Sequence, residues 1–387
     1  MTTATLTRPQ AQENRFDTVD IKVIDTDVHV EPRSFDELIP YLDAPWRDRA
    51  NLIDAVPWSR STYKTLDGGG RKDAYPEKGD IGSDPEMVGR QLFVDDPIDF
   101  AMLLPWSFRG LTVDPRLDTA LASAVNKWLA DTWLSKYNAE SRYFGAITVS
   151  VDDPVGAARE IDKWGGHPAF RQVLIGHYGP RPFGHPSYDS IWEAAARHGL
   201  PISMHFRGGA TQPLGWTSTG PLQYFVEYHS LIAPMAYASH MVSWICNGVL
   251  DRHPEMKVVF VEGGFLWYRP VVDRLQRHWK MTGHELSLRK TPLEYVHDHF
   301  RFASQPIEEN TDSQKIAALF EEANAAELLL FSSDYPHYDY DPPSKALPRS
   351  LDAEVKKRIL SENARVLYDL PKTRPVDRFD RAVGGLQ

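Results

Sequence analysis

The sequence has little of three features that mark particular classes of protein. It contains one cysteine, Cys246, so an internal disulfide framework is excluded and we expect a reducing, cytoplasmic environment. Its 43 basic residues are outnumbered by 53 acidic ones and form no basic stripe, which argues against a nucleic-acid partner. No run of about 18 apolar residues is present, so we expect no membrane span. The first residues also lack the apolar core of a secretory signal.

The overall composition is that of a globular protein of ordinary hydrophobicity. Hydrophobic residues make up 42% and charged residues 25% of the 387 positions. Short apolar runs without strict alternation are separated by helix-like segments, a pattern typical of parallel strands covered on both faces. Strands are predicted at 22–28, 99–105, 143–150, 171–176, 201–206, 257–262, 299–305 and 328–333. Helices are predicted at 116–136, 154–164, 187–199, 234–251, 267–282, 313–324 and 351–369. This order favours an α/β fold, a (β/α)₈ TIM barrel.

The barrel is predicted to occupy residues 20–370, between a flexible N-terminal arm (1–19) and a C-terminal tail (371–387). Two connections, at about 32–97 and 207–233, are too long to be plain turns. Both leave the C-terminal ends of strands. We interpret the second as a lid over the site, whereas the first is equally compatible with a lid, a surface elaboration or a dimer contact. The basic tail either wraps a partner subunit or is disordered.

Three segments that are far apart in the chain suggest one metal site. Asp27 and His29 end the first predicted strand, His205 ends the fifth, and Asp334 follows the last. Parallel barrels carry their chemistry at the C-terminal ends of their strands. Asp27 and His29 are two residues apart, so a regular strand points both side chains the same way. Two carboxylates and two imidazoles suit Zn²⁺, Mn²⁺ or Fe²⁺ and leave a position for water or substrate.

Other side chains near these strand ends are candidates for catalysis or substrate binding. Glu262 ends the strand before Gly263 and is interpreted as a proton donor or metal ligand, with a salt bridge to Arg269 as the alternative. His229, on the second long loop, is a candidate acid–base residue, or else a solvent-facing or capping histidine. Candidate substrate-binding residues are Arg207, His337 and Arg269.

With these residues in place, the sequence resembles a known family. The segments Asp27-Val28-His29, His205, Glu262-Gly263-Gly264 and Ser333-Asp334-Tyr335-Pro336 resemble the amidohydrolase-related branch of the amidohydrolase superfamily. This is the group around 2-amino-3-carboxymuconate-6-semialdehyde decarboxylase and the resorcylate and carboxyvanillate decarboxylases. The segment 358–365 is similar to the last helix of that family, and the resemblance extends over roughly residues 20–370.

The resemblance implies a (β/α)₈ barrel, commonly a homodimer, with one divalent metal ion, Zn²⁺ or alternatively Mn²⁺. It assigns ligand roles to Asp27, His29, His205 and Asp334. Two positions depart from the better-known pattern. The first motif is Asp-x-His where His-x-His is more familiar, and Glu262 stands where the decarboxylases have their acid–base histidine.

Three functions follow as hypotheses. The first is a metal-dependent, nonoxidative decarboxylase (carboxy-lyase) of an aromatic or unsaturated carboxylic acid, with Glu262 or His229 protonating carbon. The second is a hydrolase of an amide, ester or activated C–C bond, in which metal-bound water attacks and Asp334 takes the proton. The third is a noncatalytic ligand-binding barrel. In each case the partner is a small-molecule carboxylate or carbonyl compound.

Overall fold

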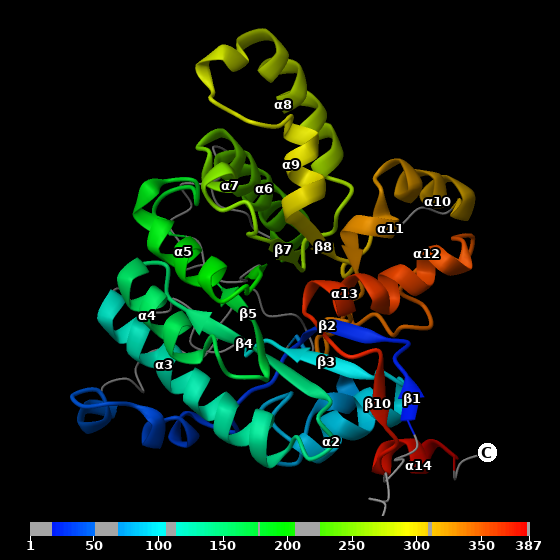
Figure 1. Cartoon of the computed structure of the whole chain (residues 1–387). Helices are drawn as coiled ribbons and strands as arrows, with labels where there is room; N and C mark the ends of the chain where they lie inside the picture. The colour runs from blue at the N-terminus through cyan, green and yellow to red at the C-terminus, as the bar shows by residue number, and fades with distance from the viewer. Residues whose placement is uncertain are drawn as a thin grey trace, which may run out of the picture.

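A computed structural model describes residues 18–50, 69–105, 114–176, 179–205, 225–308 and 312–384. In this part of the chain eight parallel strands form one sheet in sequence order (Figure 1). They are β2 (Ile24–Val28), β3 (Phe100–Leu103), β4 (Tyr143–Val149), β5 (Phe170–Ile175), β6 (Ile202–His205), β7 (Val258–Val261), β8 (Phe300–Ala303) and β9 (Leu329–Leu330). The sheet closes where the Thr26 amide donates to the Phe331 carbonyl (3.1 Å) and Val28 bridges Tyr335. The predicted (β/α)₈ barrel is confirmed, and each strand overlaps its predicted segment.

Helices follow the strands and cover the outside of the barrel. The larger ones are α3 (Pro115–Asp131), α4 (Pro154–Trp164), α5 (Asp189–Arg197), α6 (Phe225–Cys246), α8 (Tyr268–Thr282), α9 (Pro292–His299) and α10 (Ser313–Glu322). Asp114, Asp153 and Asp312 each cap the N-terminus of the helix that follows, and the side chain accepts a backbone N–H. Helix α9 is absent from the sequence prediction, although Thr291 and Glu294 form a capping box at its start.

Shorter elements complete the architecture. They are η1 (Phe35–Glu37), η2 (Ile39–Tyr41), η3 (Arg47–Arg49), η4 (Lys72–Ala74), α2 (Pro85–Arg90), η5 (Gln91–Asp95), η6 (Thr132–Lys136), η7 (Pro186–Tyr188), α7 (Val249–Arg252), η8 (Gly283–Glu285), α11 (Ala325–Leu328), α12 (Ala353–Lys357), η9 (Arg358–Glu362) and α13 (Asn363–Leu367). The first six of these lie in the first long connection, so its described part is folded into short helices. Residues 51–68 of that connection lie outside the described part.

The second long connection is shorter than predicted. Helix α6 begins at Phe225, so residues 225–233 are helical, where the sequence predicts a loop as far as 233. The helix carries apolar residues around its whole circumference, and this weakens the periodic signal by which a surface helix is detected. Residues 206–224, which hold the rest of the proposed lid, lie outside the described residues.

The barrel strands are buried on both faces, and this explains their apolar runs. The outward residues Val173, Ile202 and Phe260 belong to the core cluster shared with the helices. The inward residues Leu174 and Val259 belong to a second cluster inside the barrel. Each strand therefore lacks the polar alternation of a one-sided sheet.

The two ends of the described chain meet at the barrel. Strand β1 (Thr18–Asp20) pairs antiparallel with β10 (Thr373–Pro375), and α14 (Arg378–Gly384) follows. Buried Arg374 donates to Asp99 Oδ1 (3.0 Å) and to Asp380 Oδ1 (2.8 Å). Residues 373–384 of the predicted tail thus pack on their own barrel, whereas 1–17 and 385–387 lie outside the described residues. Across the described part, no helix combines the length and apolarity needed to cross a membrane.

We expect Arg374→Ala to lower the free energy of unfolding at pH 7 by about 3 kcal/mol, because buried Asp99 would lose the cation that compensates its burial, although Asp380 would keep Arg142. Chemical denaturation measures the change. The matched control is Arg116→Ala, whose partner Asp114 lies on the surface and whose side chain is 82% exposed. That change should leave the free energy of unfolding nearly unchanged, because water screens an exposed ion pair. Equal effects of the two substitutions would contradict a stabilising role for the buried pair.

Candidate metal centre

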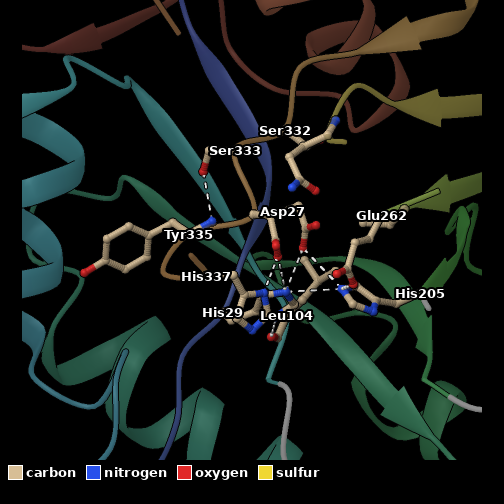
Figure 2. Close-up of polar contacts among 12 residues, drawn as sticks. Asp27, His29, Leu104, His205, Glu262, Ser332, Ser333, Tyr335 and His337 are labelled. Atoms are coloured by element: carbon tan, nitrogen blue, oxygen red, sulfur yellow. Dashed lines mark hydrogen bonds and ion pairs between the residues drawn. The ribbon is translucent and has the colours of Figure 1, made fainter. Parts of the chain in front are cut away.

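Four side chains from three strand ends meet at the C-terminal end of the barrel. Asp27 is in β2 and His29 follows it, His205 is the last residue of β6, and Asp334 lies beyond β9. Each is at most 1% exposed. One potential ligand atom from each lies within 4.8 Å of the others. Figure 2 shows Asp27, His29 and His205 pointing toward one centre.

The separations between these atoms have the scale of a metal coordination shell. His29 Nε2 lies 3.0 Å from Asp334 Oδ1, 3.3 Å from Asp27 Oδ1 and 3.2 Å from His205 Nε2. His205 Nε2 lies 3.7 Å from Asp27 Oδ1. Ligands about 2.1 Å from a tetrahedral ion are separated from one another by about 3.4 Å. The four donors therefore fit one small divalent ion.

The protonation of His29 supports the same conclusion. Its Nδ1 lies 2.9 Å from the carbonyl oxygen of Leu104, which can only accept, so Nδ1 carries the proton. In the neutral ring Nε2 then presents a lone pair to Asp27 and Asp334. A lone pair facing two carboxylates is unfavourable unless a cation lies between them. Metal-bound histidines are commonly held in this way, by a hydrogen bond from the other ring nitrogen.

The two aspartates are costly to bury without a cation. Among the described residues neither oxygen of Asp27 accepts a hydrogen bond, and Oδ2 of Asp334 accepts none. Burial raises the pKa of Asp27 well above its usual value, and the charges of Asp334 and Glu262 raise it further. Burial likewise raises the pKa of Asp334 well above its usual value, and the charge of Glu262 raises it further. A bound divalent ion would reverse this effect by stabilising the carboxylate forms.

Left-handed backbone conformations direct two of the acidic side chains. Val259 and Val261 face the interior of the barrel, so strict alternation would point Glu262 outward. The φ of Glu262 is 56°, which interrupts the alternation, and its Oε2 lies 3.4 Å from His205 Nε2. The φ of Asp334 is 59°. Such conformations are unfavourable for residues with a Cβ and occur often at functional sites.

Asp25 connects the two sides of the barrel closure beneath the site, and the sequence prediction does not single it out. Its Oδ1 accepts the Ser333 amide (3.0 Å), and its Oδ2 accepts the Ser333 hydroxyl (2.5 Å). Burial raises the pKa of Asp25 to about 7, although the hydrogen bonds from Ser333 oppose the shift. A charged residue inside an apolar strand was the available signal, because a buried carboxyl group needs a partner.

Next to the four-residue cluster lies a histidine–carboxylate pair. His229 projects from α6, not from a loop as predicted, and its Nε2 lies 3.2 Å from Glu262 Oε1. Asp339 Oδ2, which the sequence prediction also leaves out, lies 3.8 Å from the same nitrogen. Burial opposes the charge on His229, but the hydrogen bond to Glu262 and the nearby carboxylates raise its pKa overall. The salt bridge from Glu262 to Arg269 is not formed.

His337 connects the cluster to the first long connection. Its Nδ1 lies 2.6 Å from Asp334 Oδ1, and its ring centroid is 4.7 Å from that of His29. Glu262, Asp334 and His337 are a second set of buried donors within 4.8 Å of one another. Gly70 forms an antiparallel bridge with His337, and the Arg71 amide donates to the Pro336 carbonyl. The part of the first connection around Gly70 and Arg71 therefore holds the loop that carries Asp334.

Arg269 does not join the cluster. Arg269 lies on α8 and donates to Asp273 Oδ1 (3.1 Å) and to the carbonyl of Glu322 (2.9 Å). These contacts, one within α8 and one to the last residue of α10, occupy its Nε and Nη1 groups and do not support its predicted role in substrate binding, which stays a prediction. Arg207 lies outside the described residues.

A closed barrel with its polar cluster at the C-terminal strand ends is the arrangement of TIM-barrel enzymes. A family model described as "Amidohydrolase" matches residues 24–370, so the chain belongs to the amidohydrolase family.

Solved structures share the fold at low sequence identity. An amidohydrolase from Mycobacterium avium subsp. paratuberculosis is 21% identical, with a TM-score of 0.63, and the match covers 91% of this chain and 99% of that one. For the 2,6-dihydroxybenzoate decarboxylase from Rhizobium the identity is 15% and the TM-score 0.62, with coverage of 90% and 99%. The 5-carboxyvanillate decarboxylase from Novosphingobium aromaticivorans, complexed with manganese and 4-hydroxy-3-methoxy-5-nitrobenzoic acid, is 17% identical, with a TM-score of 0.61 and coverage of 90% and 96%.

We expect the purified protein to contain about one equivalent of a divalent metal ion, and Asp27→Asn and His205→Gln to lose it. Because Asp27 and Asp334 must release protons to bind the ion, the apparent affinity should increase with pH, by about tenfold per pH unit for each proton released. Elemental analysis and metal titrations at several pH values measure both effects. Asp162→Asn, which removes the surface partner of His198, is the control. Unchanged metal content in Asp27→Asn and His205→Gln would contradict the assignment.

Proposed function

We propose that the protein is a metal-dependent, nonoxidative decarboxylase of an aromatic or unsaturated carboxylic acid. The observation that carries this proposal is the position of a protonatable pair, His229 and Glu262, beside a buried cluster of metal-binding side chains. Decarboxylation needs both parts, one to hold the oxygen atoms of the substrate and one to deliver a proton to carbon. Membership of the amidohydrolase family and the shared fold with two aromatic-acid decarboxylases support it.

Asp27, His29, His205 and Asp334 are proposed to hold one divalent ion, Zn²⁺ or Mn²⁺. The donor set accommodates either ion, and manganese is present in a related structure. When bound, the ion supplies positive charge that binds the oxygen atoms of the substrate and stabilises negative charge developing on them. The hydrogen bond from His29 to Leu104 and the contact of His337 with Asp334 keep two of the donors oriented.

The proton comes from the pair beside the cluster. In the proposed reaction the bond from carbon to the carboxylate breaks, CO₂ leaves, and its bonding electrons pass to the conjugated system of the substrate. His229 donates a proton to the same carbon. Glu262 Oε1 lies 3.2 Å from His229 Nε2, so the carboxylate stabilises the charged imidazole and keeps the ring oriented. The raised pKa of His229 favours the protonated form that this step requires.

Hydrolysis of an amide, ester or activated C–C bond is the second candidate function. One observation favours it: Glu262 occupies the position where the resemblance to the decarboxylases implies a histidine. In this reaction a water molecule attacks the carbonyl carbon and Asp334 accepts its proton, while His229 protonates the leaving group. The two functions use the same residues but differ in their products.

The proposal also covers the compartment, the assembly and one substrate-binding residue. The single cysteine favours a reducing compartment, and we propose that the enzyme acts in the cytoplasm. A homodimer is proposed on the resemblance to the decarboxylases. Arg207 lies two residues after the ligand His205 in the sequence and is proposed to bind the substrate carboxylate, because a planar guanidinium group suits that anion.

Incubation with a panel of hydroxylated benzoic acids in D₂O should release CO₂ and place one deuterium on the carbon that carried the carboxyl group. Mass spectrometry and proton NMR detect both products. A parallel panel of amides and esters in H₂¹⁸O tests the alternative, in which ¹⁸O enters the product acid and no CO₂ is released. The second pattern alone would reject the decarboxylase.

His229→Asn should lower kcat by about 100-fold or more, because the proton donor is lost, while metal content stays near one equivalent. Glu262→Gln should lower kcat less and shift the acidic and basic limbs of the pH profile. The matched control is His198→Asn, since this histidine also contacts a carboxylate, Asp162, but at the surface. Full activity of His229→Asn would remove His229 from the mechanism.

A further inference from the structure

A cavity of about 600 Å³ lies at the opposite end of the barrel from the proposed metal centre. Lys257 directly precedes β7 and lines this cavity, whereas Glu262 follows the same strand at the metal centre. Five residues of extended chain separate the two positions by about 16 Å. Arg301, the second residue of β8, also lines the cavity. The cavity is therefore separate from the site already described.

Strand register brings the two cations together. Val259 is paired with Arg301, and Val259 and Ala303 belong to the cluster inside the barrel. By alternation Lys257 and Arg301 lie on this inner side, at the N-terminal mouth of the barrel. A third cation, Arg358, enters the cavity from η9.

Neither inner cation has an acidic partner among the described residues. Lys257 Nζ donates to the carbonyl of Asp298. Arg301 Nη1 donates to the carbonyls of His297 (3.0 Å) and Phe300 (2.7 Å). In the described part of the chain no carboxylate forms an ion pair with either side chain. Burial lowers the pKa of Lys257 and the charge of Arg301 lowers it further, whereas the charge of Asp298 opposes the shift.

The acidic residues around the cavity are engaged elsewhere or stand apart. Glu362 pairs with Arg365 (2.9 Å) and Glu354 with Lys357 (4.0 Å). Glu327 accepts a hydrogen bond from Asn324 (3.0 Å). Its charge favours the protonated form of Arg301, but at a distance that forms no ion pair. The cavity thus combines two cations that lack acidic partners with acidic groups that lie farther from them.

The remaining lining residues are Asn363, whose amide donates to the carbonyls of Ala326 (3.0 Å) and Leu329 (2.8 Å), and two apolar residues. Val366, which is 68% exposed, and Leu367 of α13 line the cavity together with the cations. The Nη1 group of Arg301 is held by two carbonyls, which leaves its Nε–Nη2 edge for a ligand. That edge presents two parallel N–H groups, the geometry that binds both oxygens of a carboxylate or two oxygens of a phosphate.

We propose that this cavity is a second ligand site, which binds a small oxyanion through Arg301 and Lys257. The apolar wall of Val366 and Leu367 favours a carboxylate attached to an apolar body over inorganic phosphate. The site takes no part in the proposed reaction, and the proposal does not rest on the proposed function.

Isothermal titration of the metal-loaded full chain with benzoate and with inorganic phosphate tests the proposal. Arg301→Gln should weaken benzoate binding at this site by at least about tenfold, because both the positive charge and the paired N–H groups of the guanidinium are lost. Arg301→Lys keeps the charge and should recover part of that loss. Glu327→Gln removes a nearby negative charge and should strengthen binding by about threefold. Thermal melting of each variant checks that it is folded.

A further variant separates this cavity from the metal centre. His205→Ala removes a proposed metal ligand and should leave binding at the cavity unchanged, whereas Arg301→Gln should leave turnover unchanged. Benzoate binding that is lost in His205→Ala and kept in Arg301→Gln would overturn the proposal. So would shifts of the same sign in Arg301→Gln and Glu327→Gln, or no binding at about 10 mM ligand. Phosphate binding as tight as benzoate would overturn the role of the apolar wall.

Discussion

The burial of Asp27 and Asp334 at one end of the barrel is the constraint on which the rest of the site depends. Both side chains are inaccessible to solvent, and three of their four oxygens accept no hydrogen bond among the described residues. Buried carboxylates without donors either take up protons or bind a cation. The neighbouring imidazole of His29 directs its lone pair to the same point, because its other nitrogen is held by Leu104. One divalent ion satisfies all of these groups together.

Hydrogen bonds and a backbone bridge around the cluster hold this unfavourable arrangement in place. Asp25 and Ser333 hydrogen-bond across the closure of the sheet, directly beneath the cluster. His337 contacts Asp334, and the bridge from Gly70 fixes the loop that carries both residues. These contacts orient the side chains of the cluster, and preorganisation of this kind favours electrostatic stabilisation of a reacting group.

The replacement of an expected histidine by Glu262 is compensated in space. His229 comes from α6 and meets Glu262 at hydrogen-bonding distance, so an imidazole is still present beside the cluster. The proposed proton donor and its carboxylate therefore occupy different elements, and each can be altered separately. At the other end of the barrel Lys257 and Arg301 are proposed to bind an oxyanion, so two separate places on the barrel are proposed to bind small molecules.

The barrel and the four central residues could be predicted from the sequence. The sequence contains eight apolar runs, and each is a parallel strand that is covered on both faces. Asp27, His29, His205 and Asp334 lie at the ends of these runs, and the C-terminal ends of parallel strands meet at one rim of a barrel. The helix from Phe225 was hidden because it is apolar on all sides. The partners of Glu262 emerged only from the folded chain, since its left-handed backbone breaks the alternation on which sequence reasoning relies. The folded chain alone also joined Lys257 to Arg301, because strand register is a property of the closed sheet and not of either segment.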